Sequence, residues 1–136
     1  MIRKINKDLL SLGRKSLPAD ESDIETINDL KDTLEAHRRE CVGMAANMIG
    51  VMKSIIIVNI GVSDLIMINP VIKKARKPFM TEEGCLSIDG VRKVKRFMEI
   101  EVEFLDESFT TQRRAFSGFT AQIIQHETDH CSGVII

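Results

Sequence analysis

The sequence has no tryptophan and no tyrosine, and its six phenylalanines are the only aromatic residues. Single-stranded nucleic acids stack on aromatic side chains, so a platform of that kind is not expected here. An excess of charge is also missing, because 19 Lys and Arg against 20 Asp and Glu leave a net charge of −1. Dedicated nucleic-acid binding proteins carry a basic patch. The composition therefore argues against direct binding of nucleic acid.

Long apolar runs are absent too. The longest ones, residues 55–58 and 65–68, fall far short of the roughly 20 residues of a transmembrane helix, so no membrane span is expected. The basic N-terminal segment has no apolar stretch and is not predicted to be a secretory signal. Cysteine is scarce, and the three residues form no disulfide framework: Cys41, Cys85 and Cys131. We expect reduced thiols and a cytoplasmic location.

What remains is an ordinary globular composition. The 136 residues are 43% hydrophobic and 29% charged, and no Gly-rich or Pro-rich linker divides them, which predicts a single domain over residues 1–136. Residues 19–38 are predicted to form an N-terminal helix, because apolar residues recur at helical spacing at Ile24, Ile27, Leu30 and Leu34. Either Asp20 or Ser22, the latter with Glu25 in a capping box, can begin this helix.

The middle of the chain has the patterns of strands. Residues 54–60 and 65–68 are predicted to form a hairpin, and Asn69-Pro70 to end its second strand. Residues 99–104 alternate acidic and apolar side chains, as in a strand with one buried face. Residues 92–96 are basic, and we expect these two charge sets to pair across strands rather than to form a patch for a partner.

The last predicted element is a helix from about Gly118 to Cys131. Ser117 is a suitable N-cap, and Gly133 is a suitable stop. Strands between two helices, with short connections, predict an α+β domain in which mainly antiparallel strands surround the C-terminal helix.

The strongest chemical signal lies in that C-terminal helix, where His126 and His130 are four positions apart. Such residues lie on one face of a helix, so their two imidazoles can bind one metal ion. Glu127, beside the first histidine, can act as a base on the attacking water. The alternative is a pair of surface histidines on an amphipathic helix.

A catalytic metal site normally has three protein ligands. Gly133 fits the metzincin pattern, but the sequence ends at Ile136 without the histidine of that pattern, so the third ligand is expected upstream. His37 has charged neighbours near the end of the first helix. Cys85 is the better candidate, because Gly84 permits a close backbone approach and a thiolate with two imidazoles suits Zn²⁺ or Fe²⁺. A buried apolar cysteine is the alternative.

A third segment, residues 41–50, is rich in small residues that permit contact with an extended ligand or tight packing of a helix on a sheet. Together the three segments resemble, in the same order, the motifs of the peptide deformylase family. The second and third motifs are complete, as EGCLS at residues 83–87 and QHETDH at residues 125–130. In the first, Gly-x-Gly-φ-Ala-Ala-x-Gln, residues 43–46 match, whereas Cys41 replaces the first Gly and Met48 replaces the Gln.

The resemblance implies a metal-dependent hydrolase that removes the formyl group from the N-terminal formyl-Met of nascent polypeptides. It implies one divalent ion held by Cys85, His126 and His130, with Fe²⁺ as the usual physiological ion and Zn²⁺ or Ni²⁺ as substitutes. Glu127 would take the proton of the attacking water and later deliver it to the leaving amine. The backbone N–H of Leu86 would stabilise the formyl oxygen.

The resemblance also assigns substrate-binding residues and partners. The N-formylmethionyl peptide would pair with the edge formed by Gly43 and Met44, and Gly84 would be a further substrate-binding residue. The family's Gln donates a hydrogen bond to the reacting oxygen, and Met48 has no donor. Ribosome-associated nascent chains are an implied partner, although many bacterial relatives continue into a further C-terminal helix that is not expected here. Two alternatives stay open, a binding module with little activity and an atypical metallopeptidase.

Overall fold

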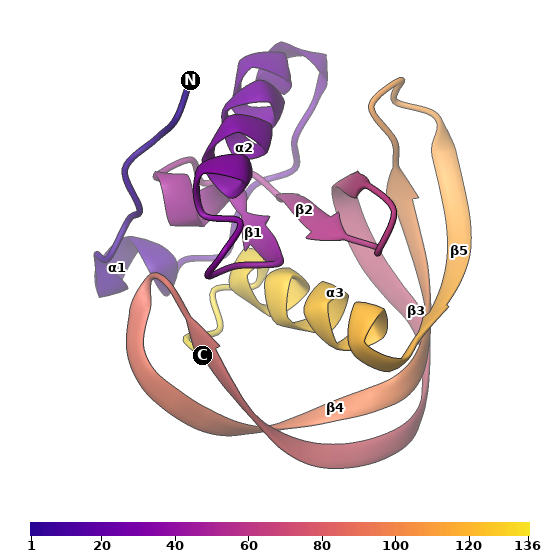
Figure 1. Ribbon diagram of the computed structural model, residues 1–136. Helices are drawn as coiled ribbons and strands as arrows, with labels where there is room; N and C mark the ends of the chain where they lie inside the picture. The colour runs from indigo at the N-terminus through magenta and orange to yellow at the C-terminus, as the bar shows by residue number, and fades with distance from the viewer.

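The structure is a computed structural model that describes residues 1–136. Its main feature is a five-stranded antiparallel sheet that curves around one helix (Figure 1). The strands follow in chain order as β1 (Gly43–Ala45), β2 (Ile55–Asn59), β3 (Asp64–Cys85), β4 (Ile88–Leu105) and β5 (Thr111–Ser117). The enclosed helix is α3 (Gly118–Cys131). The prediction of an α+β fold with antiparallel strands around the C-terminal helix is confirmed.

The N-terminal helical region is shorter than predicted. A 3-10 turn, η1 (Glu21–Asp23), leads into α2 (Ile24–Ala36). Asp20 is the cap, because its side chain accepts the Ser22 N–H and Asp23 completes the capping box in place of Glu25. Ile24 is exposed, while the other three apolar residues of the predicted stripe are buried: Ile27, Leu30 and Leu34. A further short helix, α1 (Leu9–Leu12), was not predicted.

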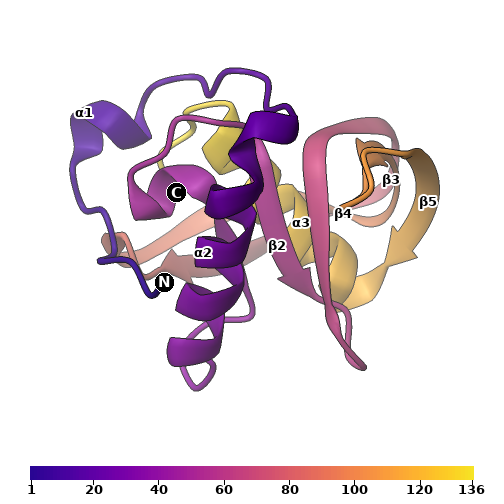
Figure 2. The ribbon, with the colours of Figure 1, turned by 90° about the horizontal axis from the view of Figure 1, so that it is seen from above.

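Strands β1 and β2 lie at the centre of the hydrophobic core. Residues 55–58 of β2 are all fully buried, and successive strand residues face opposite sides, so both faces of β2 are covered. The covering elements are α2 and α3, which both contact β1 and β2 and lie on opposite sides of β2 (Figure 2). The predicted hairpin is confirmed, because Val58 pairs with Leu65 and Asn59 with Asp64.

Strands β3 and β4 are much longer than predicted. The expected end of a strand at Asn69-Pro70 is wrong, because β3 continues to Cys85. A register shift between Ile68 and Val71 accommodates Asn69 and Pro70 within the strand. Asn69 has a φ of 51°. The Asn69 side-chain amide exchanges hydrogen bonds of 2.8 and 3.0 Å with the main chain of Ala19. Such bulges bend strands, and the β3–β4 ribbon curves around α3 (Figure 1).

The two charge sets do not pair with each other, which corrects the prediction, because residues 92–96 and 99–104 lie on the same strand, β4. The carboxylates of β4 instead find cations on both neighbouring strands. Glu99 is 3.2 Å from Lys77 of β3, and Glu101 accepts a hydrogen bond of 2.5 Å from Arg113 of β5.

Helix α3 has the predicted bounds, Gly118 and Cys131. Ser117 occupies the N-cap position without a side-chain hydrogen bond, and Gly133, at φ 77°, follows the end. The helix is buried on more than its apolar face, because His126, Glu127 and His130 are buried as well as Ala121 and Ile124. A buried helix of this kind brings polar groups into the interior. No helix in the structure has the length and apolarity needed to cross a membrane.

Candidate metal centre and active-site cavity

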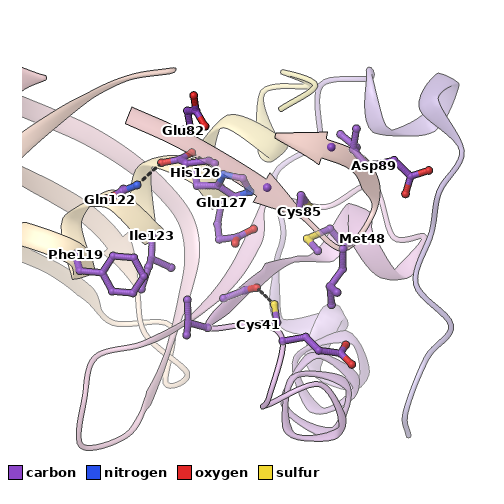
Figure 3. Close-up of a pocket in the computed structure, with 18 residues that line it drawn as sticks. Cys41, Met48, Glu82, Cys85, Asp89, Phe119, Gln122, Ile123, His126 and Glu127 are labelled. Atoms are coloured by element: carbon purple, nitrogen blue, oxygen red, sulfur yellow. Dashed lines mark hydrogen bonds and ion pairs between the residues drawn. The ribbon is translucent and has the colours of Figure 1, made fainter. Parts of the chain in front are cut away.

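A cavity of about 630 Å³ opens between β1, the β3–β4 turn and α3 (Figure 3). Most of the residues that the sequence assigned to the site line it: Gly43, Met48, Gly84, Cys85, Leu86, His126 and Glu127. His130 and Met44 are not in the lining, and both are 0% exposed. The side chain of Met44 belongs to the hydrophobic core. Of the two residues predicted to pair with the peptide, only Gly43 lines the cavity.

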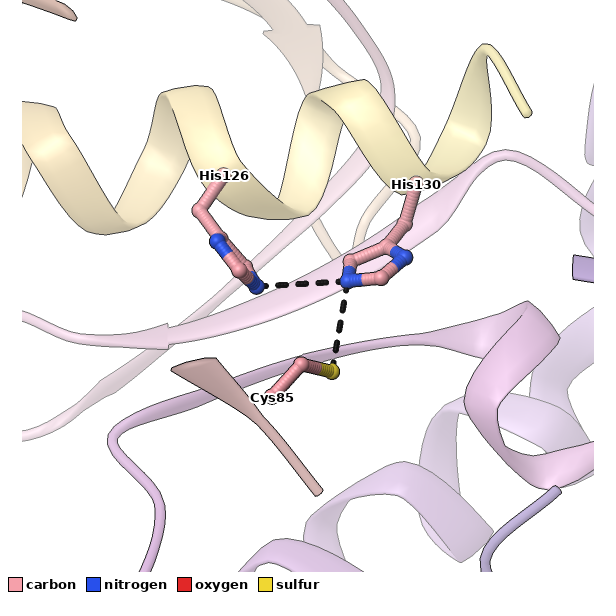
Figure 4. A group of neighbouring side chains, drawn as sticks. All are labelled: Cys85, His126 and His130. Atoms are coloured by element: carbon pink, nitrogen blue, oxygen red, sulfur yellow. Dashed lines mark hydrogen bonds between the residues drawn. The ribbon is translucent and has the colours of Figure 1, made fainter. Parts of the chain in front are cut away.

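Three side chains from distant parts of the chain converge beside the cavity (Figure 4). Cys85 ends β3, and His126 and His130 lie one turn apart on α3. His130 Nε2 is 3.2 Å from His126 Nε2 and 3.4 Å from Cys85 Sγ. Ligands of one tetrahedral ion at metal–ligand distances of about 2.0–2.3 Å lie about 3.3–3.6 Å apart. Both the spacing and the donor atoms therefore fit a single borderline metal ion.

The electrostatic environment favours one positive charge among these groups. Burial lowers the pKa of His126, but hydrogen bonds with Cys85 and Glu83 outweigh it and raise that pKa to about 10. Burial, together with the charge of His126, lowers the pKa of His130 to about 3. The two imidazoles therefore share a single positive charge.

Glu83 orients His126 from the side away from the other two donors. The carboxylate can only accept, so the 2.8 Å contact between Glu83 Oε1 and His126 Nδ1 assigns the proton to Nδ1 and leaves Nε2 facing His130. Arg96 and Gln122 also donate to Glu83, at 2.7 and 2.9 Å. Burial opposes ionisation of Glu83, but hydrogen bonds from His126, Arg96 and Gln122 lower its pKa to about 2.

Arg96 connects three elements around this carboxylate. It projects inward from β4, is 5% exposed, and also donates to Asp129 of α3 at 2.7 Å. Sequence reasoning gave no role to Glu83, Arg96, Gln122 or Asp129. One signal was available for Glu83, which is two positions before Cys85 on β3 and therefore on the same face of the strand. Gln122 offered another, because it is one helical turn before His126.

Glu127 lies at the cavity with a free oxygen. It is 4% exposed, and its Oε1 has no hydrogen-bond partner. Burial raises the pKa of Glu127 to about 7, against the opposing charge of His126. A carboxyl group with a pKa near neutrality can both accept and return a proton at physiological pH.

Gly43 allows β1 to approach α3 at this point. A Cβ atom on Gly43 would lie 2.7 Å from Ile123 Cγ2 and 3.1 Å from Glu127 Oε2. The small-residue segment therefore serves tight packing of helix on sheet, and the same packing places Glu127 beside β1. Gly84 is different, because a Cβ there would meet its nearest atom at 3.5 Å, an ordinary contact.

Met48, its neighbour Asn47 and Cys41 lie at or beside the positions where the first motif is not matched. Met48 is 1% exposed, and its Sδ accepts the Ala45 N–H at 3.4 Å. The side-chain amide of Asn47 donates to the His130 carbonyl at 2.9 Å and so holds the metal-site helix. Cys41 lines the cavity near Gly43, and burial raises the pKa of its thiol to about 12.

An α+β fold whose cavity combines a Cys, His and His donor set with a buried carboxylate defines a metal-dependent hydrolase. The family model for polypeptide deformylase matches residues 1–136. The peptide deformylase of Clostridium beijerinckii is 54% identical over 136 residues, which are 100% of both chains. The chain belongs to the polypeptide deformylase family.

Solved structures agree with this assignment. The peptide deformylase from Thermotoga maritima matches with a TM-score of 0.89 and 26% identity, over 99% of this chain and 95% of that one. A class I type b peptide deformylase from Acinetobacter baumannii with bound Met-Ala-Ser matches with a TM-score of 0.88 and 26% identity, over 99% and 97% of the two chains. These relatives support deformylase activity over the two alternatives, a binding module and a metallopeptidase.

Proposed function

We propose that this protein removes the formyl group of N-formylmethionyl peptides, with Cys85, His126 and His130 as ligands of one divalent ion and Glu127 as the proton carrier. The observation that carries the proposal is the convergence of the three donor atoms, within 4.8 Å of one another, beside the unpartnered Oε1 of buried Glu127. The residues come from two of the three sequence motifs, which supports their assignment as one site.

Each residue has a distinct task in the reaction. When bound, the metal acidifies a water molecule and polarises the formyl carbonyl. Glu127 accepts the proton of the attacking water at Oε1 and carries it to the leaving amine, for which a pKa of about 7 is well placed. Leu86 lines the cavity next to Cys85, and we assign its backbone N–H as a donor to the formyl oxygen.

The cavity offers apolar surface and a strand edge to the substrate. Five apolar side chains that suit a methionine line it: Val42, Leu86, Ile88, Phe119 and Ile123. We assign Gly43 and Gly84 as contacts of the peptide main chain. The peptide extends along β1 as an added strand. The bound Met-Ala-Ser of the Acinetobacter baumannii relative supports a peptide of this kind.

We infer that the native ion is Fe²⁺, the usual ion of the deformylase family. Zn²⁺ or Ni²⁺ can replace it, because a thiolate with two imidazoles accepts all three. Cys41, Cys85 and Cys131 are free, which suits a reducing cytoplasm in which ribosome-associated chains are the source of substrate. We also assign residues 1–136 to one domain, because core residues from Ala19 to Cys131 form one hydrophobic cluster. Metal analysis of protein purified without oxygen tests the choice of ion.

A formate-release assay tests the proposed function. Protein purified anaerobically and loaded with Fe²⁺ is expected to convert formyl-Met-Ala-Ser into equal amounts of formate and Met-Ala-Ser. The unformylated peptide is the control, and it is expected to remain intact. Cleavage inside either peptide, or no formate from fully metal-loaded protein, would contradict the proposal.

A further inference from the structure

Two residues of this chain depart from the first deformylase motif, and both are sulfur side chains that line the cavity. Cys41 replaces a Gly and Met48 replaces the Gln. Cys41 Sγ is in direct contact with the carbonyl oxygen of Gly43. Met48 Sδ lies 3.4 Å from the backbone nitrogen of Ala45. Both departures therefore contact the main chain of the same short strand, β1.

Strand β1 has a free edge, because it is the first strand in the sheet and pairs only with β2. In an antiparallel pair, residues that exchange hydrogen bonds alternate with residues that do not. The Asn59 N–H donates to the Val42 carbonyl at 2.8 Å, which makes this a bonded pair. Gly43 and Ala45 consequently direct their N–H and C=O groups away from β2, toward the free edge.

The two sulfur atoms form hydrogen bonds with two of these edge groups. The Cys41 thiol is the donor to the Gly43 carbonyl, and the Met48 thioether is the acceptor for the Ala45 N–H. A peptide that adds to β1 as a strand uses such edge groups for its own main-chain hydrogen bonds. Thiols are weak donors and thioethers are weak acceptors, so an amide of an incoming peptide can replace them.

We propose that Cys41 and Met48 cap the free edge of β1, and that the substrate peptide displaces the Cys41 thiol from the Gly43 carbonyl when it binds. The inference rests on the proposed function, in which the peptide pairs with β1. The cavity is built for a ligand at this point, because Glu127 is buried with its Oε1 unpartnered, next to Gly43. Cys41 is thus a positioning residue that acts on substrate binding and not on the chemical step.

Two substitutions of Cys41 with opposite effects test the proposal. Cys41→Ala removes the donor and keeps Cβ, so the KM for formyl-Met-Ala-Ser is expected to fall about two- to three-fold with kcat unchanged, as for the loss of one weak hydrogen bond. Cys41→Ser supplies a stronger donor to the same carbonyl, and the KM is expected to rise. Both variants remove side-chain volume, so a packing role would shift both in the same direction.

A second measurement does not depend on turnover. The S–H stretching band of Cys41, assigned by subtracting the infrared spectrum of Cys41→Ala, is expected to move to higher frequency when Met-Ala-Ser binds the Ni²⁺-loaded protein. Cys131, which is buried away from the cavity lining, supplies the control band and is expected not to move. Calorimetric titration with Met-Ala-Ser is expected to give affinities that follow the KM order of the three proteins.

Equal KM values and affinities in the three proteins, or an S–H band that stays in place on peptide binding, would overturn the proposal. Failure of the proposed function has a different signature. In that case the parent protein releases no formate although its metal content is complete, while the band and the titration still report whether a peptide displaces the Cys41 thiol.

Discussion

At the scale of single residues, the chemistry depends on the free oxygen of Glu127. Glu127→Gln keeps the shape of the side chain but cannot accept a proton, so kcat is expected to fall by about 10²–10⁴. Metal content is expected to be unchanged, because Glu127 is not in the donor set of Cys85, His126 and His130. Steady-state kinetics with metal analysis measure both quantities. Glu25→Gln on the exposed side of α2 is the control, and a Glu127→Gln variant as fast as this control would refute the assignment.

Met48 is the residue at which this chain departs most from the expected chemistry. Its sulfur cannot donate to the developing oxyanion, and the amide of Asn47 is already engaged with the His130 carbonyl. A Gln at position 48 can accept the Ala45 N–H with its oxygen and still donate with its nitrogen. One oxyanion donor elsewhere is worth about 10²–10³ in turnover. Met48→Gln is expected to raise kcat about ten-fold, because the surrounding side chains are not arranged for an amide.

The measurement for Met48 is steady-state kinetics on one formyl-Met peptide at matched Ni²⁺ content. Met48→Leu is the control, since it keeps an apolar side chain of similar volume and adds no donor, and its kcat is expected not to rise. A Met48→Gln variant with an unchanged or lower kcat would show that another group donates to the oxyanion.

At the scale of secondary-structure elements, the close approach of β1 to α3 sets the position of Glu127. In Gly43→Ala, the added Cβ would collide with Ile123 and crowd Glu127, and it would also lie 3.2 Å from the Ile57 carbonyl. Overpacking of this kind costs about 1–3 kcal/mol, so we expect a lower free energy of unfolding and a lower kcat. Gly84→Ala is the matched control, because its Cβ meets only ordinary contacts. Equal thermal stability of the two variants would contradict this account.

The sequence predicted elements whose signals are local. Helix α3 shows both caps and the spacing of its histidines, and the β2–β3 hairpin shows two apolar runs around a turn. The extension of β3 beyond Asn69 had no such signal, since residues 73–78 are all exposed and show no alternation. A turn signal at Asn69-Pro70 became a bulge because the β4 partner continues the ladder. Pairing with a distant strand thus overrode the local preference.

The candidate site likewise contains residues that have a local sequence signal and residues that have none. His126, His130, Glu127 and Cys85 could be found because they stand in short motifs. The contacts of their supporting residues could not be predicted, because these contacts join distant positions: Glu83 and His126 are 43 residues apart, and Arg96 and Asp129 are 33 residues apart. Arg96, in a basic run, has no local pattern that distinguishes an inward side chain from a solvated one, whereas Gln122 has only its place one helical turn before His126.

At the scale of the whole molecule, the metal site connects two parts of the fold that are distant in sequence. Cys85 lies at the turn between β3 and β4, whereas His126 and His130 lie on α3. Only the folded chain brings these three donors together, so a metal that binds them stabilises the folded state over the unfolded one. The ligands must lose protons to bind, and His126, whose pKa is about 10, must release one. The stabilisation is therefore expected to weaken as the pH falls.

Thermal unfolding with and without Ni²⁺ measures this linkage. At a free Ni²⁺ concentration about 100 times Kd, binding adds about 2.7 kcal/mol, which for a chain of this length raises Tm by about 10 °C. In Cys85→Ser the hydroxyl does not ionise as a thiol does, so we expect the Ni²⁺-dependent rise to disappear. The metal-free Tm of Cys85→Ser is expected to stay close to that of the metal-free parent, which separates loss of a ligand from loss of the fold.

At one fixed free Ni²⁺ concentration, the Ni²⁺-dependent rise in the Tm of the parent is expected to be smaller at pH 5.5 than at pH 7.5. A Tm rise that Cys85→Ser retains in full would remove Cys85 from the ligand set, and a rise that is independent of pH would show that Ni²⁺ binding releases no proton from His126.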